Sequence, residues 1–447
     1  MSVLTIAIIV VFIAGYALIA LESVTKINKA AIALLMFVVC WVLYMVHPET
    51  YQPGMGGEEL AARVNAVIEN HLGSTSTTLF FLMGAMTIVE IVDQNGGFNF
   101  VRETLKTRSK RKLLWRIVVL TFFLSAILDN MTTTIVMIMV LRKLVQEHKD
   151  RIIYASLVVL AANAGGAFSP IGDVTTIMLW NVGLITAAGV IKEVFLPSVV
   201  SIVVPALILQ YSLKGELADP DTATVNAEAQ ELSPWQRKAV FVLGVGGLIF
   251  VPVFHSLTDL PPFVGILLVL SVLWLATELF YRSLPKAQLA GGTSKRVVNL
   301  LSRVDMSTIL FFLGILMTVA CLEEIGVLSA VGRGLNVAFD GNHYLVTGLI
   351  GVLSSIVDNV PLVAGSMGMY PLQAAGDFAV DGVFWQLLAY CAGVGGSMLI
   401  IGSAAGVVAM GLEKINFGWY MRHISWIAFV GYVCGIISYY LLRTFVF

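Results

Sequence analysis

Long apolar runs separated by short polar connectors dominate the chain. A helix that crosses a bilayer needs about 20 apolar residues. Two long runs, 152–190 and 382–410, are interrupted by glycine-rich stretches. Uninterrupted runs occur at 3–21, 30–46, 75–93, 194–213, 237–256, 262–281, 306–325 and 421–442. Since backbone polar groups must be satisfied internally in lipid, the pattern predicts an all-α polytopic membrane protein.

Composition narrows the class further. The chain has 447 residues, of which 58% are hydrophobic and only 12% are charged, too few to cover a soluble surface. The net charge of −1 provides no basic field for nucleic acid. The four cysteines and six histidines are dispersed, without the spacing of a metal or redox motif. A transporter or channel is therefore favoured over an enzyme.

Two further apolar runs, 114–141 and 344–371, each contain a polar pair in their middle. The first reads LSAILDN up to Asn130 and the second reads LSSIVDN up to Asn359. A carboxylate in the membrane costs several kcal/mol and usually marks a functional site. Asp129 and Asp358 are therefore candidate functional residues. We expect each run to be a re-entrant helical hairpin with its Asp-Asn pair at the tip.

The basic residues support hairpins over full crossings. If both runs return to the side on which they begin, 23 of the 27 Lys and Arg residues fall on one side of the membrane. The positive-inside rule makes that side cytoplasmic. Full crossings would place the basic stretch 142–151 outside, which the rule disfavours.

The sequence also repeats itself. TTLFFLMGAMTIVEIVD (77–93) aligns with TILFFLGILMTVACLEE (308–324), and AANAGGAFSPIGDVTT (161–176) aligns with CAGVGGSMLIIGSAAG (391–406). With the Asp-Asn strings, all three matches lie about 230 positions apart. The predicted topology runs the two copies in opposite directions, so they are inverted repeats, each with a hairpin and a discontinuous helix. The predicted organisation is scaffold helices at 1–74, a first transport repeat at 75–213, a cytoplasmic linker at 214–236, scaffold helices at 237–305 and a second, inverted transport repeat at 306–447.

Carboxylate, amide and hydroxyl oxygens from the hairpin tips and helix breaks suit a hard cation such as sodium. Capping of the hairpin helices is an alternative role for Asn130 and Asn359. It explains Asp129 and Asp358 poorly, because Ser or Thr would cap without a charge. The candidate residues for ion binding and proton coupling are Asp129, Asn130, Thr132, Thr133, Ser169, Asp173, Thr175, Asp358, Asn359 and Ser403, and five of these (Asp129, Asn130, Asp173, Asp358, Asn359) are the expected Na⁺ ligands. Supporting residues are Ser125, Asn163, Thr176, Ser354, Ser397 and Glu90, the last as a proton-path or interfacial group.

The mechanism expected from these residues is competition. A buried carboxylate holds either a proton or a sodium ion, and an empty charged site crosses the membrane reluctantly. Asp173 has Ser403 as its counterpart, so the two repeats are not equivalent in charge.

The DN-x-x-T tip, the SPIGDVTT break and the repeated DN pair resemble the NhaD-type sodium/proton antiporters of the ion-transporter superfamily. This resemblance implies export of Na⁺ or Li⁺ in exchange for H⁺, with no cofactor. It also implies a homodimer in the bacterial cytoplasmic (inner) membrane, or in a chloroplast envelope.

Other functions remain open from the sequence. A sodium-coupled carboxylate carrier or an arsenite-type permease would share the fold and would neutralise its anion with a cationic residue or helix N-termini. The repeat motifs contain no Lys or Arg, and their carboxylates would repel an anion. An intramembrane aspartyl protease would use Asp129 and Asp358 as a dyad, although these aspartates lie in Asp-Asn pairs. An ion channel is compatible with the composition, whereas inverted hairpins favour a carrier.

Overall fold

The structure is a computed structural model that describes residues 2–20, 25–51, 57–97, 104–105, 107–213, 215–217, 232–282, 297–356 and 359–446. Throughout these ranges the chain forms α-helices joined by turns and short 3₁₀ segments. Seven of the described helices are long and apolar enough to cross a membrane. The prediction of an all-α polytopic membrane protein is confirmed.

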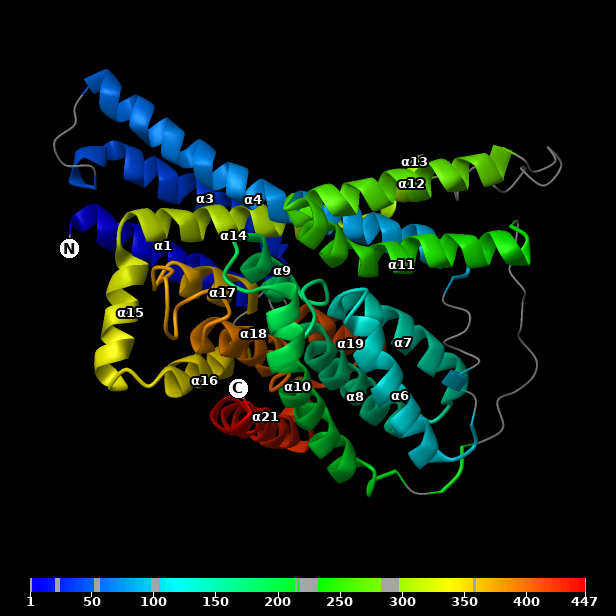
Figure 1. Ribbon diagram of the computed structural model, residues 1–447. Helices are drawn as coiled ribbons and strands as arrows, with labels where there is room; N and C mark the ends of the chain where they lie inside the picture. Colours follow the sequence, from blue (N-terminus) through cyan, green and yellow to red (C-terminus); the bar gives the residue numbers. More distant parts are fainter. Residues whose placement is uncertain are drawn as a thin grey trace.

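The helices fall into two groups, each of which makes most of its contacts within itself (Figure 1). The first group lies in the upper part of the view. It contains α1 (Val3–Ala20), α3 (Lys29–Val46), α4 (Gly57–Gln94), α11 (Pro234–Thr258), α12 (Pro262–Arg282) and α14 (Met306–Glu324), with the short elements η1 (Pro48–Thr50), α13 (Val297–Leu300) and η3 (Leu301–Arg303). Contacts of α14 with α3 and of α12 with α4 and α11 hold this group together.

The second group contains both runs with the Asp-Asn strings. Its helices from the first half are α6 (Lys110–Ser125), α7 (Asn130–Leu144), α8 (His148–Ala167), α9 (Val174–Asn181) and α10 (Ala187–Leu209). Those from the second half are α16 (His343–Ser354), α17 (Asn359–Met367), α18 (Val383–Gly395), α19 (Ala404–Glu413), α20 (Phe417–His423) and α21 (Ser425–Phe445). The amphipathic helix α15 (Val327–Ala338) connects α14 of the first group to α16.

Each run with an Asp-Asn string is split into two helices, as the hairpin prediction requires. α6 ends at Ser125, and α7 begins after a turn that Asp129 caps. In the second run α16 ends at Ser354, and α17 begins at Asn359. The other two interrupted runs are also broken, between α8 and α9 and between α18 and α19. Side chains cap the second part of each, Asp173 for α9 and Ser403 for α19.

Contacts at corresponding positions of the two halves match. Ser125 donates its hydroxyl hydrogen to the carbonyl of Ala162, and Ser354 does the same to the carbonyl of Ala392. Glycines one helical turn further along approach a neighbouring backbone equally closely. A Cβ added at Gly165 would lie 2.1 Å from the carbonyl oxygen of Phe122, and one added at Gly395 would lie 2.2 Å from that of Gly351. The helix crossings of the two halves are thus built alike.

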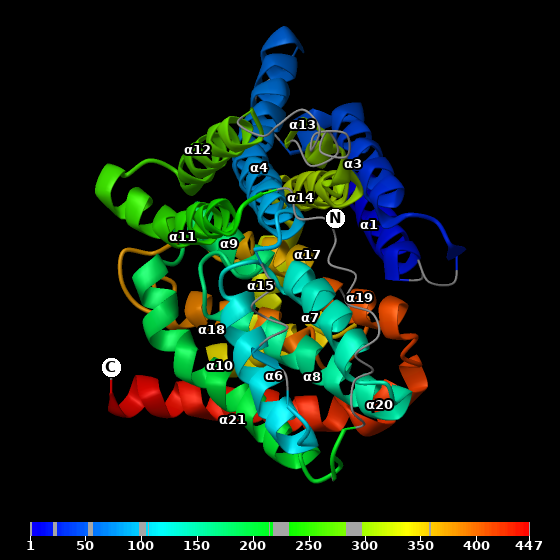
Figure 2. The same cartoon turned by 90° about the vertical axis from the view of Figure 1, so that its right-hand side faces the viewer.

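Three features of the helices differ from the sequence prediction. Helix α4 begins at Gly57, so much of the connector predicted at 47–74 is helical; Figure 2 shows this end projecting from the rest of the molecule. Helix α15 was not predicted, since its alternating apolar and polar positions are too short and too polar to span lipid. The last run is divided at Ile424 into α20 and α21.

Candidate functional site

Asp173 is the centre of a buried polar cluster between the two halves of the chain. Its side chain is only 1% exposed. One carboxylate oxygen accepts hydrogen bonds from the backbone N–H and the hydroxyl of Thr175, at 3.0 and 2.9 Å. The other accepts from the side-chain amide of Asn130 at 2.7 Å. The amide of Asn359 lies 3.4 and 3.5 Å from the two oxygens.

These contacts bring together residues that are distant in the sequence. Asn130 is the first residue of α7 and Asn359 is the first residue of α17, so each Asp-Asn string contributes one amide. Asp173 comes from the break in the first long helix. The structure therefore brings one amide from each Asp-Asn string to the same carboxylate.

Asn163 extends the cluster to the second broken helix. Its side-chain oxygen accepts from Asn130 at 3.1 Å. Its amide nitrogen donates to the hydroxyls of Ser397 and Ser403, both at 2.9 Å. Since the amide of Asn130 faces a carboxylate, its nitrogen must point that way, and this fixes the orientation of Asn163 as well.

The carboxylate of Asp129 has different partners from that of Asp173. It is the N-cap of α7, and its carboxylate accepts from the backbone N–H of Thr132 at 2.8 Å and from the Thr132 hydroxyl at 2.6 Å. Its backbone has φ 102° and ψ 157°, a region that costs a residue with a side chain on the order of 1–3 kcal/mol. Such strain is concentrated at functional sites. The cap of this helix is thus Asp129, whereas Asn130 turns towards Asp173.

The remaining predicted site residues have separate positions and contacts. Thr133 is fully buried and its hydroxyl oxygen has no hydrogen-bond partner in the structure. Ser169 donates to the carbonyl of Ala126, and Thr176 donates to the carbonyl of Asp173. Glu90 lies on α4, where it forms an ion pair with Arg303 at 3.7 Å. Asp358, predicted as a ligand, lies outside the described residues.

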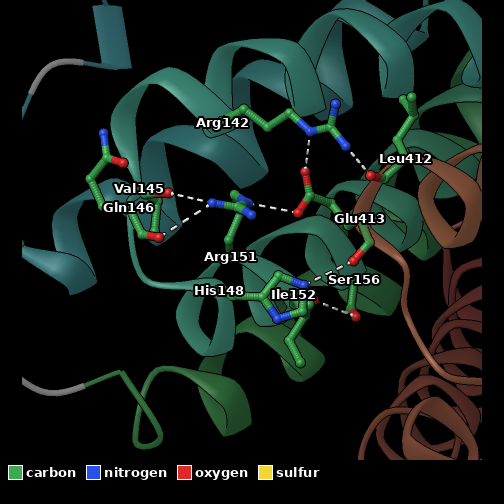
Figure 3. A network of polar contacts seen from close by, with 9 residues as sticks. All are labelled: Arg142, Val145, Gln146, His148, Arg151, Ile152, Ser156, Leu412 and Glu413. Atoms are coloured by element: carbon green, nitrogen blue, oxygen red, sulfur yellow. Dashed lines mark hydrogen bonds and ion pairs between the residues drawn. The ribbon is translucent and has the colours of Figure 1, made fainter.

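A second buried carboxylate, Glu413, was not predicted (Figure 3). Its side chain is fully buried at the end of α19. Arg142 and Arg151 bind its two oxygens at 2.7 and 2.6 Å, and His148 donates to its backbone carbonyl at 3.0 Å. The network ties the α7–α8 connection to α19. A lone glutamate that closes a long apolar run was the available signal in the sequence.

Glu193 is a third buried carboxylate that the sequence analysis did not single out. It lies on α10, where the hydroxyl of Tyr439 donates to it at 2.9 Å and Arg443 forms an ion pair with it. Both partners belong to α21. This pair joins two long helices that pack together over much of their length, and it has a structural role distinct from that of Asp173.

Comparisons with known proteins place this architecture among membrane transporters. The family model described as Citrate transporter (CitMHS) matches residues 16–387. Sodium/proton antiporter 1 of Arabidopsis thaliana is 45% identical over 97% of this chain and 72% of its own length. Sodium/proton antiporter 2 of the same plant is 43% identical over 96% of this chain and 98% of its own length.

A bacterial relative is also similar over nearly the whole chain. The Na(+)/H(+) antiporter NhaD of Vibrio cholerae is 30% identical over 98% of this chain and 91% of its own length. The chain belongs to the citrate transporter (CitMHS) family and, within it, to the NhaD-type sodium/proton antiporters.

Proposed function

We propose that this protein exports Na⁺ or Li⁺ in exchange for H⁺, and that Asp173 binds the two kinds of ion competitively. The observation that carries the proposal is the arrangement around this carboxylate, which is almost completely buried and faces amides from both hairpin tips. Relatives named as sodium/proton antiporters over nearly the full chain support the same cargo.

Competition follows from burial. A bare carboxylate away from water is costly, so Asp173 favours a neutralising partner, either a proton or a cation. Candidate oxygen ligands for sodium lie on the two helices that begin at the Asp-Asn strings. Thr133 carries a buried hydroxyl oxygen without a hydrogen-bond partner, and Asn130 and Asn359 each carry an amide oxygen. Asp129 and Asp358 at the two hairpin tips are further proposed ligands.

The amides next to Asp173 support two states of the site. In the structure they present N–H groups, which stabilise a carboxylate without a cation. Rotation of an amide by half a turn exposes its oxygen instead. Asn130 and Asn359 thus act as donors to the empty carboxylate and as ligands when Na⁺ occupies the site.

The charges around the site favour a cation over an organic anion. Residues 117–141, 152–191 and 344–413 contain no Lys or Arg. Helix N-termini attract anions, but α7 and α9 are capped by the carboxylates of Asp129 and Asp173. An anion at this site would therefore meet negative charge.

Transport then proceeds by alternating access. The two repeats are proposed to be inverted copies that expose the site to either side of a bacterial cytoplasmic membrane, with the basic loops inside and the protein present as a homodimer. A chloroplast envelope is a further location that the plant relatives make reasonable.

Exchange is tested in inside-out vesicles from a host without sodium/proton antiporters. A proton gradient is set up, and NaCl, LiCl, KCl or sodium citrate is added while a dye reports lumenal pH. We expect Na⁺ and Li⁺ to collapse the gradient, and citrate to add nothing. Asp173→Asn and Asp129→Asn should abolish the response while retaining the helix caps, because Asn is also a good N-cap.

Asp305→Asn is the matched control, since Asp305 caps α14 outside the cluster. It should leave exchange unchanged. The family description makes a sodium-coupled citrate carrier the specific rival. Uptake of labelled citrate that depends on sodium, without a pH response to NaCl or LiCl, would replace the antiporter with that carrier.

A further inference from the structure

A cavity of about 440 Å³ lies between the two helix groups. Thr78 of α4 and Glu323 of α14 line it on one side, and Met178 of α9 and Ala364 of α17 line it on the other. None of these residues takes part in the polar cluster at Asp173. Because both groups contribute to the lining, relative movement of the groups would reshape the cavity.

Helices α9 and α17 connect the cavity to the polar cluster at Asp173. Met178 lies five residues after Asp173, and Ala364 lies five residues after Asn359. At a rise of 1.5 Å per residue, both are roughly 7–8 Å along their helix axes from the polar cluster. Helices α9 and α17 also pack against each other. The cavity therefore lies one to two helical turns along α9 and α17 from the polar cluster.

The cavity opens towards the predicted external side. His71, Glu323 and Leu372 contribute to its lining. They lie in or next to the connectors 47–74, 326–343 and 372–381, which the predicted topology places opposite the side that carries 23 of the 27 basic residues. Glu323 and Leu372 are exposed. On the predicted cytoplasmic side, Arg142 and Arg151 instead hold α19 to the α7–α8 connection through Glu413.

We propose that this cavity is the external entrance of the transport site, through which protons arrive and the exported cation leaves. Its place in the transport cycle rests on the proposed antiport. Within it, Glu323 supplies a negative charge that attracts cations. The adjacent Glu324 is already paired with His71 at 2.9 Å, which joins α14 to α4 in the wall of the cavity. A unit charge about 10 Å away in water changes the local cation concentration roughly twofold.

Cysteine labelling in intact cells tests the entrance. In a variant with its four native cysteines replaced by serine, Ala364→Cys is treated from outside with a membrane-impermeant, cationic methanethiosulfonate. Val363→Cys is the control, since Val363 is fully buried and does not line the cavity. We expect Ala364→Cys to react at least tenfold faster. Met178→Cys and Leu179→Cys form an equivalent pair on α9.

Equal rates within both pairs would overturn the proposal. So would reaction at position 364 only when the reagent reaches the cytoplasmic face. Adding Glu323→Gln should slow labelling by the cationic reagent roughly twofold at low ionic strength and leave a neutral reagent unaffected. Equal slowing of both reagents would remove the electrostatic role of Glu323.

The labelling result does not depend on exchange. A reactive Ala364→Cys in a protein that fails the vesicle assay would leave the entrance in place and remove the proposed cargo. Normal Na⁺/H⁺ exchange together with unreactive Ala364→Cys and Met178→Cys would remove the entrance and leave the proposed cargo in place.

Discussion

Arg151 Nε lies 2.6 Å from Glu413 Oε2, an ion pair that joins the start of α8 to the end of α19. A comparable contact joins the other two ends of the broken helices. Asp381, just before α18, accepts hydrogen bonds from the backbone N–H and the hydroxyl of Thr186, which caps α10 in the turn after α9, both at 2.7 Å. The start of each broken helix is thus attached to the end of the other.

Replacing Glu413 with glutamine should destabilise the protein. The glutamate side chain is fully buried, and its loss would leave Arg142 and Arg151 without their shared partner. Breaking such a pair costs about 3 kcal/mol. The measurement is thermal unfolding of purified protein in detergent. Glu147→Gln is the matched control, because Glu147 is exposed and lies 3.8 Å from Lys110, so its pair contributes little. An equal effect of both substitutions would contradict the prediction.

Gly395→Ala should disrupt the crossing of α18 and α16. The added methyl group would lie 2.2 Å from the carbonyl oxygen of Gly351, a backbone atom that cannot move aside without shifting its helix. Overpacking of this kind costs about 1–3 kcal/mol or more. Folded yield and unfolding temperature measure the effect. Gly411→Ala in α19 is the control, since no atom lies within 4 Å of its added Cβ, and it should be neutral or stabilising.

Asn163→Ala should impair exchange more than folding. The amide links Asn130 to Ser397 and Ser403, so its loss frees the orientation of Asn130 next to Asp173. We expect exchange to fall at least tenfold in the vesicle assay, with amounts of folded protein near those of the wild type. Asn336→Ala, which removes a weak contact with Tyr370 at 3.4 Å, should retain exchange. Unchanged exchange in Asn163→Ala would show that the amide bridge has no part in ion binding.

Tyr439→Phe should lower stability, whereas Tyr440→Phe should not. The hydroxyl of Tyr439 donates to the buried Glu193 at 2.9 Å, and its removal leaves that carboxylate with one partner fewer. Loss of a buried hydrogen bond to a charged group costs about 1.5–3 kcal/mol. Tyr440 is 50% exposed. Thermal unfolding of the two variants in the same detergent compares neighbouring positions on one helix, and similar melting temperatures would disprove the structural role of this contact.

Much of this architecture could be predicted from the sequence because membrane helices have a strong apolar signal. The splits at Asp129 and Asp173 could be predicted as well, because aspartate is costly in lipid unless it serves a site, and the glycines near Asp173 weaken a helix. The partners of these residues could not. That Asn130 donates to Asp173, and that Asp129 instead caps its own helix, depends on how the helices cross.

Glu413 and the start of α4 were missed for related physical reasons. Glu413 is neutralised by Arg142 and Arg151, which are over 260 positions away, so the sequence around Glu413 does not show which residues offset its burial. The polar first half of α4 carries no apolar run of its own, and it is helical as a continuation of the spanning segment.

Two aspartates of the first repeat, Asp129 and Asp173, each have two roles, and this limits how the protein can change. Asp129 and Asp173 start α7 and α9 as caps and are also proposed ligands. A substitution that retunes ion affinity at either position also alters the start of a helix. Evolutionary adjustment of selectivity is therefore expected at positions free of that constraint, such as Thr133, whose buried hydroxyl oxygen has no hydrogen-bond partner and caps no helix.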